Sequence, residues 1–156
     1  MAEPERDSPG VIALPPLLYF VILVLGVALD FLFPLHPFPG RPTRILGALL
    51  VIASIALAIW GRRTMSAAGT NINPREPALV LVTNGPFRFS RNPLYLALTG
   101  MYAGVALLIN GLWTLILVVP LLIVTQVGIV QREERYLERK FGEEYRAYRS
   151  RVRRWI

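Results

Sequence analysis

The fold of this chain is decided by residues 94–130, which read LYLALTGMYAGVALLI, then NG, then LWTLILVVPLLIVTQVGIV. Both apolar runs lack charged residues, and each predicts a helix inside a lipid bilayer. The dipeptide Asn110-Gly111 leaves room only for a tight turn, so the second helix must return antiparallel to the first. We therefore predict a helical hairpin with transmembrane spans at residues 94–109 and 112–130.

Two further apolar runs precede this hairpin, at residues 14–33 and 45–60. Hydrophobic residues make up 54% of the 156 residues, which is too apolar for an ordinary soluble domain. We therefore predict an all-α, polytopic membrane protein with about four transmembrane helices and a C-terminal amphipathic interfacial helix. It would form a single domain over residues 1–156, with a mobile polar tail at residues 1–13.

Basic residues are distributed unevenly between the two sides of the predicted membrane protein. One Lys or Arg precedes the first span, five lie between the second and third, and nine follow the fourth, against only Arg41 and Arg44 on the other side. The positive-inside rule then places both termini and the loop before residue 94 in the cytoplasm. The formal net charge of +7 fits contact with anionic membrane lipid, and we expect no nucleic-acid partner.

Few residues outside the polar loops carry reactive chemistry. The chain has no cysteine, which excludes disulfides and thiol catalysis, and its one histidine, His36, cannot build a metal cluster. We therefore expect no metal site. Asp30 is the only charged residue in the first span, and we expect it to reach the interface or to pair with Arg41 or Arg44, with a functional role inside the membrane as the alternative.

The polar stretch before the hairpin, residues 81–95, reads LVTNGPFRFSRNPLY and is where we expect the chemistry. Pro93 suits the first turn of the following helix, which makes Asn92 the expected N-terminal cap. Arg91 and Tyr95 would then point at a ligand held near the free backbone N–H groups of that helix. The alternative is a capped membrane helix with arginines that extend to the interface.

Residues 131–156 follow the fourth span and predict cytoplasmic helices. Four residues apart, Glu134 would meet Glu138 and Arg135 would meet Arg139, so like charges face each other. We therefore expect these side chains to find partners elsewhere in the fold. The alternative is a solvated helix in which Arg135 pairs with Glu138 three residues on.

The last part of the chain carries an amphipathic stripe. Apolar and aromatic side chains recur at helical spacing in the order Phe141, Tyr145, Tyr148, Val152 and Trp155. Arginines occupy the other faces of this predicted helix. We expect the stripe to lie along the membrane surface or to dock over the polar loop.

Three short motifs occur in a characteristic order: LVTNG at residues 81–85, RNPLY at residues 91–95, and Glu133-Glu134 followed by FGEEY at residues 141–145. Together they resemble the integral-membrane methyltransferases that include isoprenylcysteine carboxyl methyltransferase and phosphatidylethanolamine N-methyltransferase. The resemblance covers roughly Leu79 to Tyr148. It implies binding of S-adenosylmethionine on the cytoplasmic side and a lipophilic small-molecule or lipid acceptor that enters from the bilayer.

The resemblance also implies which residues form the site. The expected cofactor-binding residues are Leu81, Val82, Phe87, Asn92, Pro93, Leu94, Tyr95, Glu133 and Glu134, and the candidate catalytic residues are Arg91 and Glu133. Carboxylates and aromatic faces suit the sulfonium and ammonium groups of the cofactor, and an arginine suits its carboxylate. Methyl transfer is an in-line displacement that needs positioning and exclusion of water, so it does not require His or Cys.

Two positions depart from the isoprenylcysteine enzymes and bear on the acceptor. Asn92 stands where those enzymes have His, and Ile129 stands where they have an Arg one turn before the first Glu. Arg91, in contrast, matches them. We therefore expect S-adenosylmethionine-dependent methyl transfer to a lipid or another small hydrophobic acceptor, with carboxyl O-methylation as the alternative. From another class, the alternative is a non-catalytic four-helix membrane scaffold or small-molecule binder.

Overall fold

The computed structural model describes residues 8–38 and 40–156, and this described part contains helices and no strands. In chain order the elements are α1 (Pro15–Leu32), α2 (Gly40–Ala67), the 3-10 turn η1 (Gly85–Arg88), α3 (Pro93–Ile109), α4 (Leu112–Thr125), the π-helical turn η2 (Gln126–Val130) and α5 (Gln131–Arg151). Three helical stretches are long and apolar enough to cross a bilayer: α1, α2 and the continuous run from α4 into α5. A shorter apolar helix, α3, has 17 residues. The prediction of an all-α polytopic membrane protein is confirmed.

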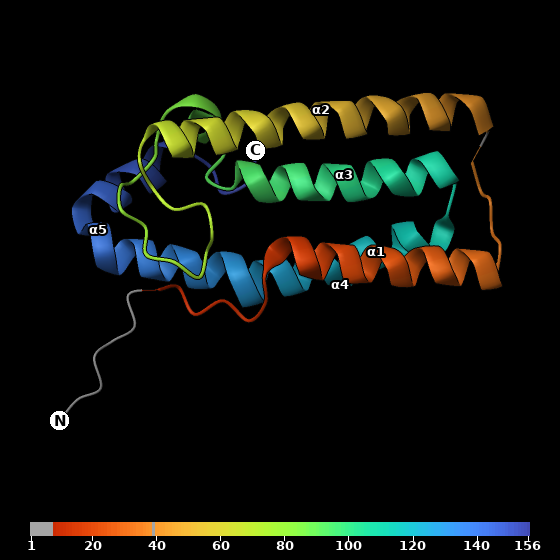
Figure 1. Cartoon of the computed structure of the whole chain (residues 1–156), viewed down its shortest axis with the longest axis horizontal. Coiled ribbons are helices and arrows are strands. Elements are labelled where there is room, and N and C mark those ends of the chain that lie inside the picture. The colour runs from red at the N-terminus through yellow and green to blue at the C-terminus, as the bar shows by residue number, and fades with distance from the viewer. Residues whose placement is uncertain (1–7, 39) are drawn as a thin grey trace.

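The four apolar helices run side by side in two pairs (Figure 1). One pair is α2 with α3, the other is α1 with α4, and α3 also contacts both helices of the second pair. Short connections join the helices at one end, whereas the long loop from α2 to α3 and the helix α5 lie together at the other end (Figure 1). The fold therefore collects its polar segments at a single end of an apolar bundle.

The short-loop end is fixed by polar side chains that satisfy helix termini. Asn110 adopts the left-handed conformation, with φ of 54°, and its side chain exchanges hydrogen bonds with the backbone of Phe38. Asp30 accepts hydrogen bonds from the backbone N–H groups of Trp113 and Thr114, so it caps the start of α4. The tight turn is confirmed. The expected pairing of Asp30 with an arginine is wrong, because the free N–H groups of α4 are closer partners.

Glycines bring α2 and α3 into close contact. A Cβ added to Gly47 would lie 2.7 Å from the carbonyl oxygen of Gly104 and 2.8 Å from the backbone nitrogen of Leu108. A Cβ added to Gly104 would lie 2.7 Å from Cγ2 of Val51. Small residues of this kind allow backbones to approach and pack through van der Waals contact inside a membrane.

We expect Gly47→Ala to destabilise the protein by about 1–3 kcal/mol, because the new methyl group meets backbone atoms that cannot rotate away. Thermal unfolding in detergent measures the effect. Gly40→Ala is the matched control, since a Cβ there meets no described atom within 4 Å. Equal melting temperatures for the two variants would contradict close packing at Gly47.

Several boundaries differ from those predicted. The second helix continues beyond the predicted span of residues 45–60 at both ends, because charge limits burial in lipid but does not end a helix. A π-helical turn at residues 126–130 interrupts the fourth predicted span. The last helix ends at Arg151, where Val152 turns to an extended conformation, so the expectation of helix up to residue 156 is wrong.

Part of the predicted mobile tail packs against the start of α5 and the turn before it. The backbone N–H of Ile12 donates to the carbonyl of Gly128 at 3.4 Å, and Arg132 donates to the carbonyl of Gly10 at 3.0 Å. The absence of a side chain at Gly128 makes room for Ile12. The expectation of a mobile tail is therefore corrected for residues 8–13, and residues 1–7 lie outside the described part.

Candidate active site

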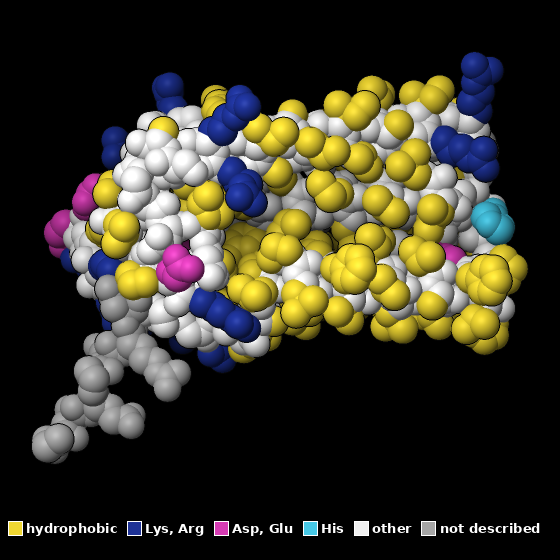
Figure 2. All heavy atoms as spheres, viewed as in Figure 1, with side chains coloured by type: hydrophobic (Ala, Val, Ile, Leu, Met, Phe, Trp, Pro, Cys, Tyr) yellow, Lys and Arg dark blue, Asp and Glu magenta, His cyan; other side chains and the backbone are white. Residues whose placement is uncertain are grey.

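A cavity of about 950 Å³ lies between α1 and α2 and extends under the long loop to α5. Figure 2 shows the hollow on the face of the molecule, with hydrophobic side chains around it. The residues that line it include all ten that the sequence predicts for the site: Leu81, Val82, Phe87, Arg91, Asn92, Pro93, Leu94, Tyr95, Glu133 and Glu134. The fold thus brings these residues to one place, and their roles stay predictions.

The cavity has lining of two kinds. On the α5 side it includes Arg91 and Glu133, which carry opposite charges. On the bilayer side its walls are apolar and come from three helices, with Phe20 on α1, Ala58 on α2 and Leu98 on α3. A molecule with a charged group and an apolar body could therefore be held in one continuous space.

The long loop is held onto α5 by hydrogen bonds. The hydroxyl of Tyr136 accepts from the backbone N–H of Ala78 at 3.1 Å, and the hydroxyl of Tyr148 donates to the carbonyl of Phe87 at 2.8 Å. Gly85 has φ of 56°, and a Cβ there would lie 2.6 Å from the Thr64 hydroxyl oxygen. These contacts therefore hold the loop in place as a wall of the cavity. The loop also requires a glycine at residue 85.

A break in α5 brings the aromatic stripe over this loop. Gly142 has non-helical angles, φ 52° and ψ −120°, so the helix changes direction there. The second half carries Tyr145 and Tyr148, which are both buried. Of the two expected placements of the stripe, docking over the loop is confirmed for these two tyrosines.

Glu133 projects from the first turn of α5 toward α3. Its carboxylate accepts a hydrogen bond of 2.5 Å from the Tyr95 hydroxyl. The side chain is half-buried: it faces the cavity and is otherwise surrounded by protein. This burial raises the pKa of Glu133 from its ordinary value of 4.5 to about 7. The hydrogen bond from Tyr95 lowers the pKa, and the nearby charge of Glu134 raises it further. Glu133 is thus a carboxylate that can change protonation near neutral pH.

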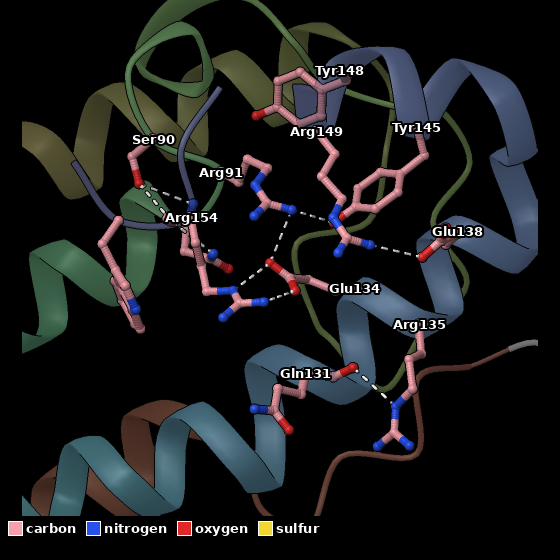
Figure 3. Close-up of polar contacts among 12 residues, drawn as sticks. Ser90, Arg91, Gln131, Glu134, Arg135, Glu138, Tyr145, Tyr148, Arg149 and Arg154 are labelled. Carbon is pink, nitrogen blue, oxygen red and sulfur yellow. Dashed lines mark hydrogen bonds and ion pairs between the residues drawn. The ribbon is translucent and has the colours of Figure 1, made fainter. Parts of the chain in front are cut away.

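Glu134 lies between two guanidinium groups. Arg91 approaches one oxygen at 3.1 Å, and Arg154 makes a bidentate contact with hydrogen bonds of 2.9 and 2.8 Å. Figure 3 shows both arginines pointing at this carboxylate. Arg91 is nearly buried, donates to the Tyr145 hydroxyl at 3.2 Å, and keeps an Nε atom with no hydrogen-bond partner among the described residues. Because Arg91 also lines the cavity, its positive charge suits an anionic ligand there.

Like-charged residues lie four apart on α5, and their spacing predicts that they pair with groups elsewhere rather than with each other. Glu138 pairs with Arg149 at 3.1 Å, whereas Arg135 donates to the carbonyl of Gln131 (Figure 3). The alternative pairing of Arg135 with Glu138 is therefore wrong. The bend at Gly142 explains the difference, because it returns Arg149 to the first half of the helix.

The sequence profile of the phospholipid methyltransferase family matches residues 42–144. The chain belongs to the phospholipid methyltransferase family. An uncharacterised protein of Haemophilus influenzae is 49% identical over 47 residues, which are 30% of this chain and 73% of that relative. No solved structure matches the chain. The family assignment confirms the resemblance that the three motifs indicate, and it implies membrane methyltransferase activity.

In this family member, the side chain of Asn92 makes a contact other than the predicted one. It precedes α3, but its side chain makes no capping hydrogen bond to the helix. Its Nδ2 atom donates instead to the carbonyl of Arg154 at 3.0 Å, and its backbone N–H donates to the Ser90 hydroxyl at 3.1 Å. Asn92 thus stands at the N-cap position, but the predicted capping by its side chain is wrong, because the hydrogen bond from Nδ2 to Arg154 fixes the amide in another orientation.

The methyltransferase-family site also contains residues that the sequence did not predict. Tyr136 lines the cavity, and a signal existed, because it lies one helical turn after Glu133 and so shares its face. Arg154 is ten residues past the end of the family match, and no local pattern marks it. Its position depends on the bend at Gly142 and on the extended chain after Val152.

Proposed function

We propose that this protein transfers a methyl group from S-adenosylmethionine to a lipophilic acceptor at the membrane. The observation that carries the proposal is the continuous cavity, which joins a charged end at Arg91 and Glu133 to an apolar opening between α1 and α2. A soluble cofactor and a bilayer-borne acceptor need to meet in such a space. The alternative of a non-catalytic scaffold gives no reason for a buried arginine with an orphaned donor.

The residues present fit the cofactor. Glu133 offers a carboxylate to its positive groups, and the guanidinium group of Arg91 offers a positive charge to its carboxylate. The ring of Phe87 and the backbone of Leu81 and Val82 line the same space. When bound there, S-adenosylmethionine supplies an electrophilic methyl group. The protein would contribute orientation and exclusion of water.

Glu133 can also accept a proton as a general base. An amine or hydroxyl acceptor would have to give up a proton when it takes the methyl group that the cofactor supplies. The pKa of Glu133, raised by burial to about 7, suits a general base near neutral pH. Its hydrogen bond to Tyr95 holds the carboxylate in place.

A carboxylate acceptor fits the site less well. Such an acceptor needs a cation to orient it, and Arg91, which pairs with Glu134, is already assigned to the cofactor carboxylate. Ile129, which stands where isoprenylcysteine enzymes have an Arg, is fully buried beside Tyr95 and Val130 and is not part of the cavity wall. We therefore favour a lipid or another small hydrophobic acceptor over prenylcysteine.

The same proposal places the α5 end and both termini in the cytoplasm. Basic side chains cluster at this end of the molecule, with a smaller group at the opposite end, while apolar side chains cover the helices between the two ends (Figure 2). Such a distribution follows the positive-inside rule. Protease accessibility in oriented membrane vesicles would test it.

The deciding experiment is transfer of a labelled methyl group from S-adenosylmethionine into a native membrane extract, followed by alkaline hydrolysis. We expect stable label in a lipid or another hydrophobic product. Base-labile label released as methanol would indicate a carboxyl ester and contradict the favoured acceptor. No transfer, together with no binding of the cofactor at millimolar concentration, would contradict the enzyme proposal itself.

We expect Tyr95→Phe to weaken cofactor binding about five- to tenfold and to move the midpoint of its pH dependence upward. The hydroxyl of Tyr95 holds the pKa of Glu133 down, so its loss leaves Glu133 protonated at higher pH. Calorimetric titrations over a pH series measure both effects. Tyr102→Phe is the control on the same helix, because its hydroxyl bonds to the carbonyl of Thr114. An unmoved midpoint in Tyr95→Phe would contradict the coupling.

A further inference from the structure

The last five residues, 152–156, follow the end of α5 and return to the loop before α3; we call this segment the C-terminal strap. It lies beyond residues 42–144, which match the family. It holds the loop before α3 through its backbone: the N–H of Arg91 donates to the carbonyl of Arg153 at 3.0 Å, and the side chains of Ser90 and Asn92 donate to the carbonyl of Arg154.

The strap is anchored at its far end as well. The indole N–H of Trp155 donates to the side-chain oxygen of Gln126 at 3.1 Å, and its ring packs against the cluster of Tyr95, Ile129 and Val130. Gln126 begins the π-helical turn η2. Such turns often occur at functional sites, and this one connects the membrane helix α4 to the helix that bears Glu133.

Between these anchors, the Arg154 side chain controls Glu134. Its fork occupies both carboxylate oxygens, and the oxygen that accepts from Nε of Arg154 is also the one that Arg91 approaches. A buried carboxylate held bidentately has a fixed orientation. Arg91 therefore meets a fixed partner, which in turn fixes the direction of its own guanidinium group.

We propose that Arg154 is a positioning residue for the cofactor: through Glu134 it aims the guanidinium group of Arg91, which lines the cavity, at the cofactor carboxylate. The inference rests on the proposed function, and it adds that the strap outside the family match completes the site. Arg154 itself need not touch the cofactor. The proposal assigns to it an effect on affinity rather than on the chemical step.

The test measures binding of S-adenosylmethionine by calorimetry, together with KM for the cofactor and kcat, on detergent-solubilised full-length variants. We expect Arg154→Ala to raise Kd and KM about tenfold while kcat at saturating cofactor changes less than about threefold. Arg154→Lys keeps the charge without the fork and should fall between the two. Arg151→Ala, which removes an exposed positive charge nearby, should behave as wild type.

A double-mutant cycle separates positioning from general stabilisation. If Arg154 acts through Glu134, the pair Glu134→Gln with Arg154→Ala binds the cofactor no more weakly than Glu134→Gln alone. Additive losses, or an unchanged Kd in Arg154→Ala, would overturn the proposal while leaving the proposed function intact. If wild-type protein fails to bind the cofactor, the proposed function fails and this inference fails with it. Should Arg154→Ala not fold, Arg154→Lys and its cycle with Glu134→Gln decide the question.

Discussion

Glu133→Gln should weaken binding of S-adenosylmethionine about ten- to hundredfold and remove the pH dependence of binding near neutrality. A charge-assisted contact in a partly buried site contributes about 1.5–3 kcal/mol, which corresponds to that change in affinity. In the wild type, only the ionised carboxylate attracts the positive groups of the cofactor. Because the pKa of Glu133 is about 7, affinity should fall as the pH drops below that value and level off above it.

The same substitution should affect the stability of the ligand-free protein in the opposite direction. The folded-state pKa of Glu133 lies above its ordinary value of 4.5, so the folded state binds the proton more readily than the unfolded chain between these values. Raising the pH through that window therefore lowers the free energy of unfolding, and the cost is complete above about pH 7. Glu133→Gln removes this cost, so it should stabilise the apoprotein by about 1–3 kcal/mol above neutral pH and much less near pH 5.

Calorimetric titrations over a pH series, with thermal unfolding of the same samples, measure both effects. Glu143→Gln is the matched control, because Glu143 is exposed on the second half of α5 and, among the residues that the structure describes, pairs with the exposed Arg146. It should change neither affinity nor its pH dependence. Small and equal effects at Glu133 and Glu143 would show that Glu133 belongs to a solvated helix face.

Much of the fold could be predicted from local patterns. The apolar runs and the Asn110-Gly111 turn specify a hairpin, because a bilayer accepts only helices of about this length and polarity. What the sequence could not specify is where polar groups find partners across the fold. Asp30 could not be matched to the start of α4 in advance, since that contact exists only once α1 and α4 are packed.

The same difference between local patterns and contacts across the fold applies to the candidate site. Residues within the family motifs, such as Tyr95 and Glu133, could be named because the motifs carry them and helical geometry brings them together. The partner of Glu134 could be expected, but not identified, from the like charge four residues away. Arg154 could not be found, because its approach depends on the left-handed glycine at residue 142 and on the end of helix α5.

Arg91→Lys should weaken cofactor binding about ten- to hundredfold although it conserves the charge. The Arg91 guanidinium contacts Glu134 and the Tyr145 hydroxyl through one nitrogen, Nη1, and the residue also lines the cavity. A lysine ammonium is a compact point charge, so it can keep the pair with Glu134 but cannot also present a second, oriented donor. The loss should therefore appear in Kd and KM for S-adenosylmethionine.

The control is Arg88→Lys, three residues earlier in η1, where the side chain is exposed and lies outside the cavity wall. Thermal unfolding should show that both variants fold, because the lysine at residue 91 still neutralises the buried carboxylate of Glu134. Arg91→Ala would remove one of the two cations that Glu134 contacts and would destabilise the protein as well, so it would mix the two effects. Wild-type affinity in Arg91→Lys would mean that charge alone suffices at this position, and it would contradict a directed contact from the guanidinium group to the cofactor carboxylate.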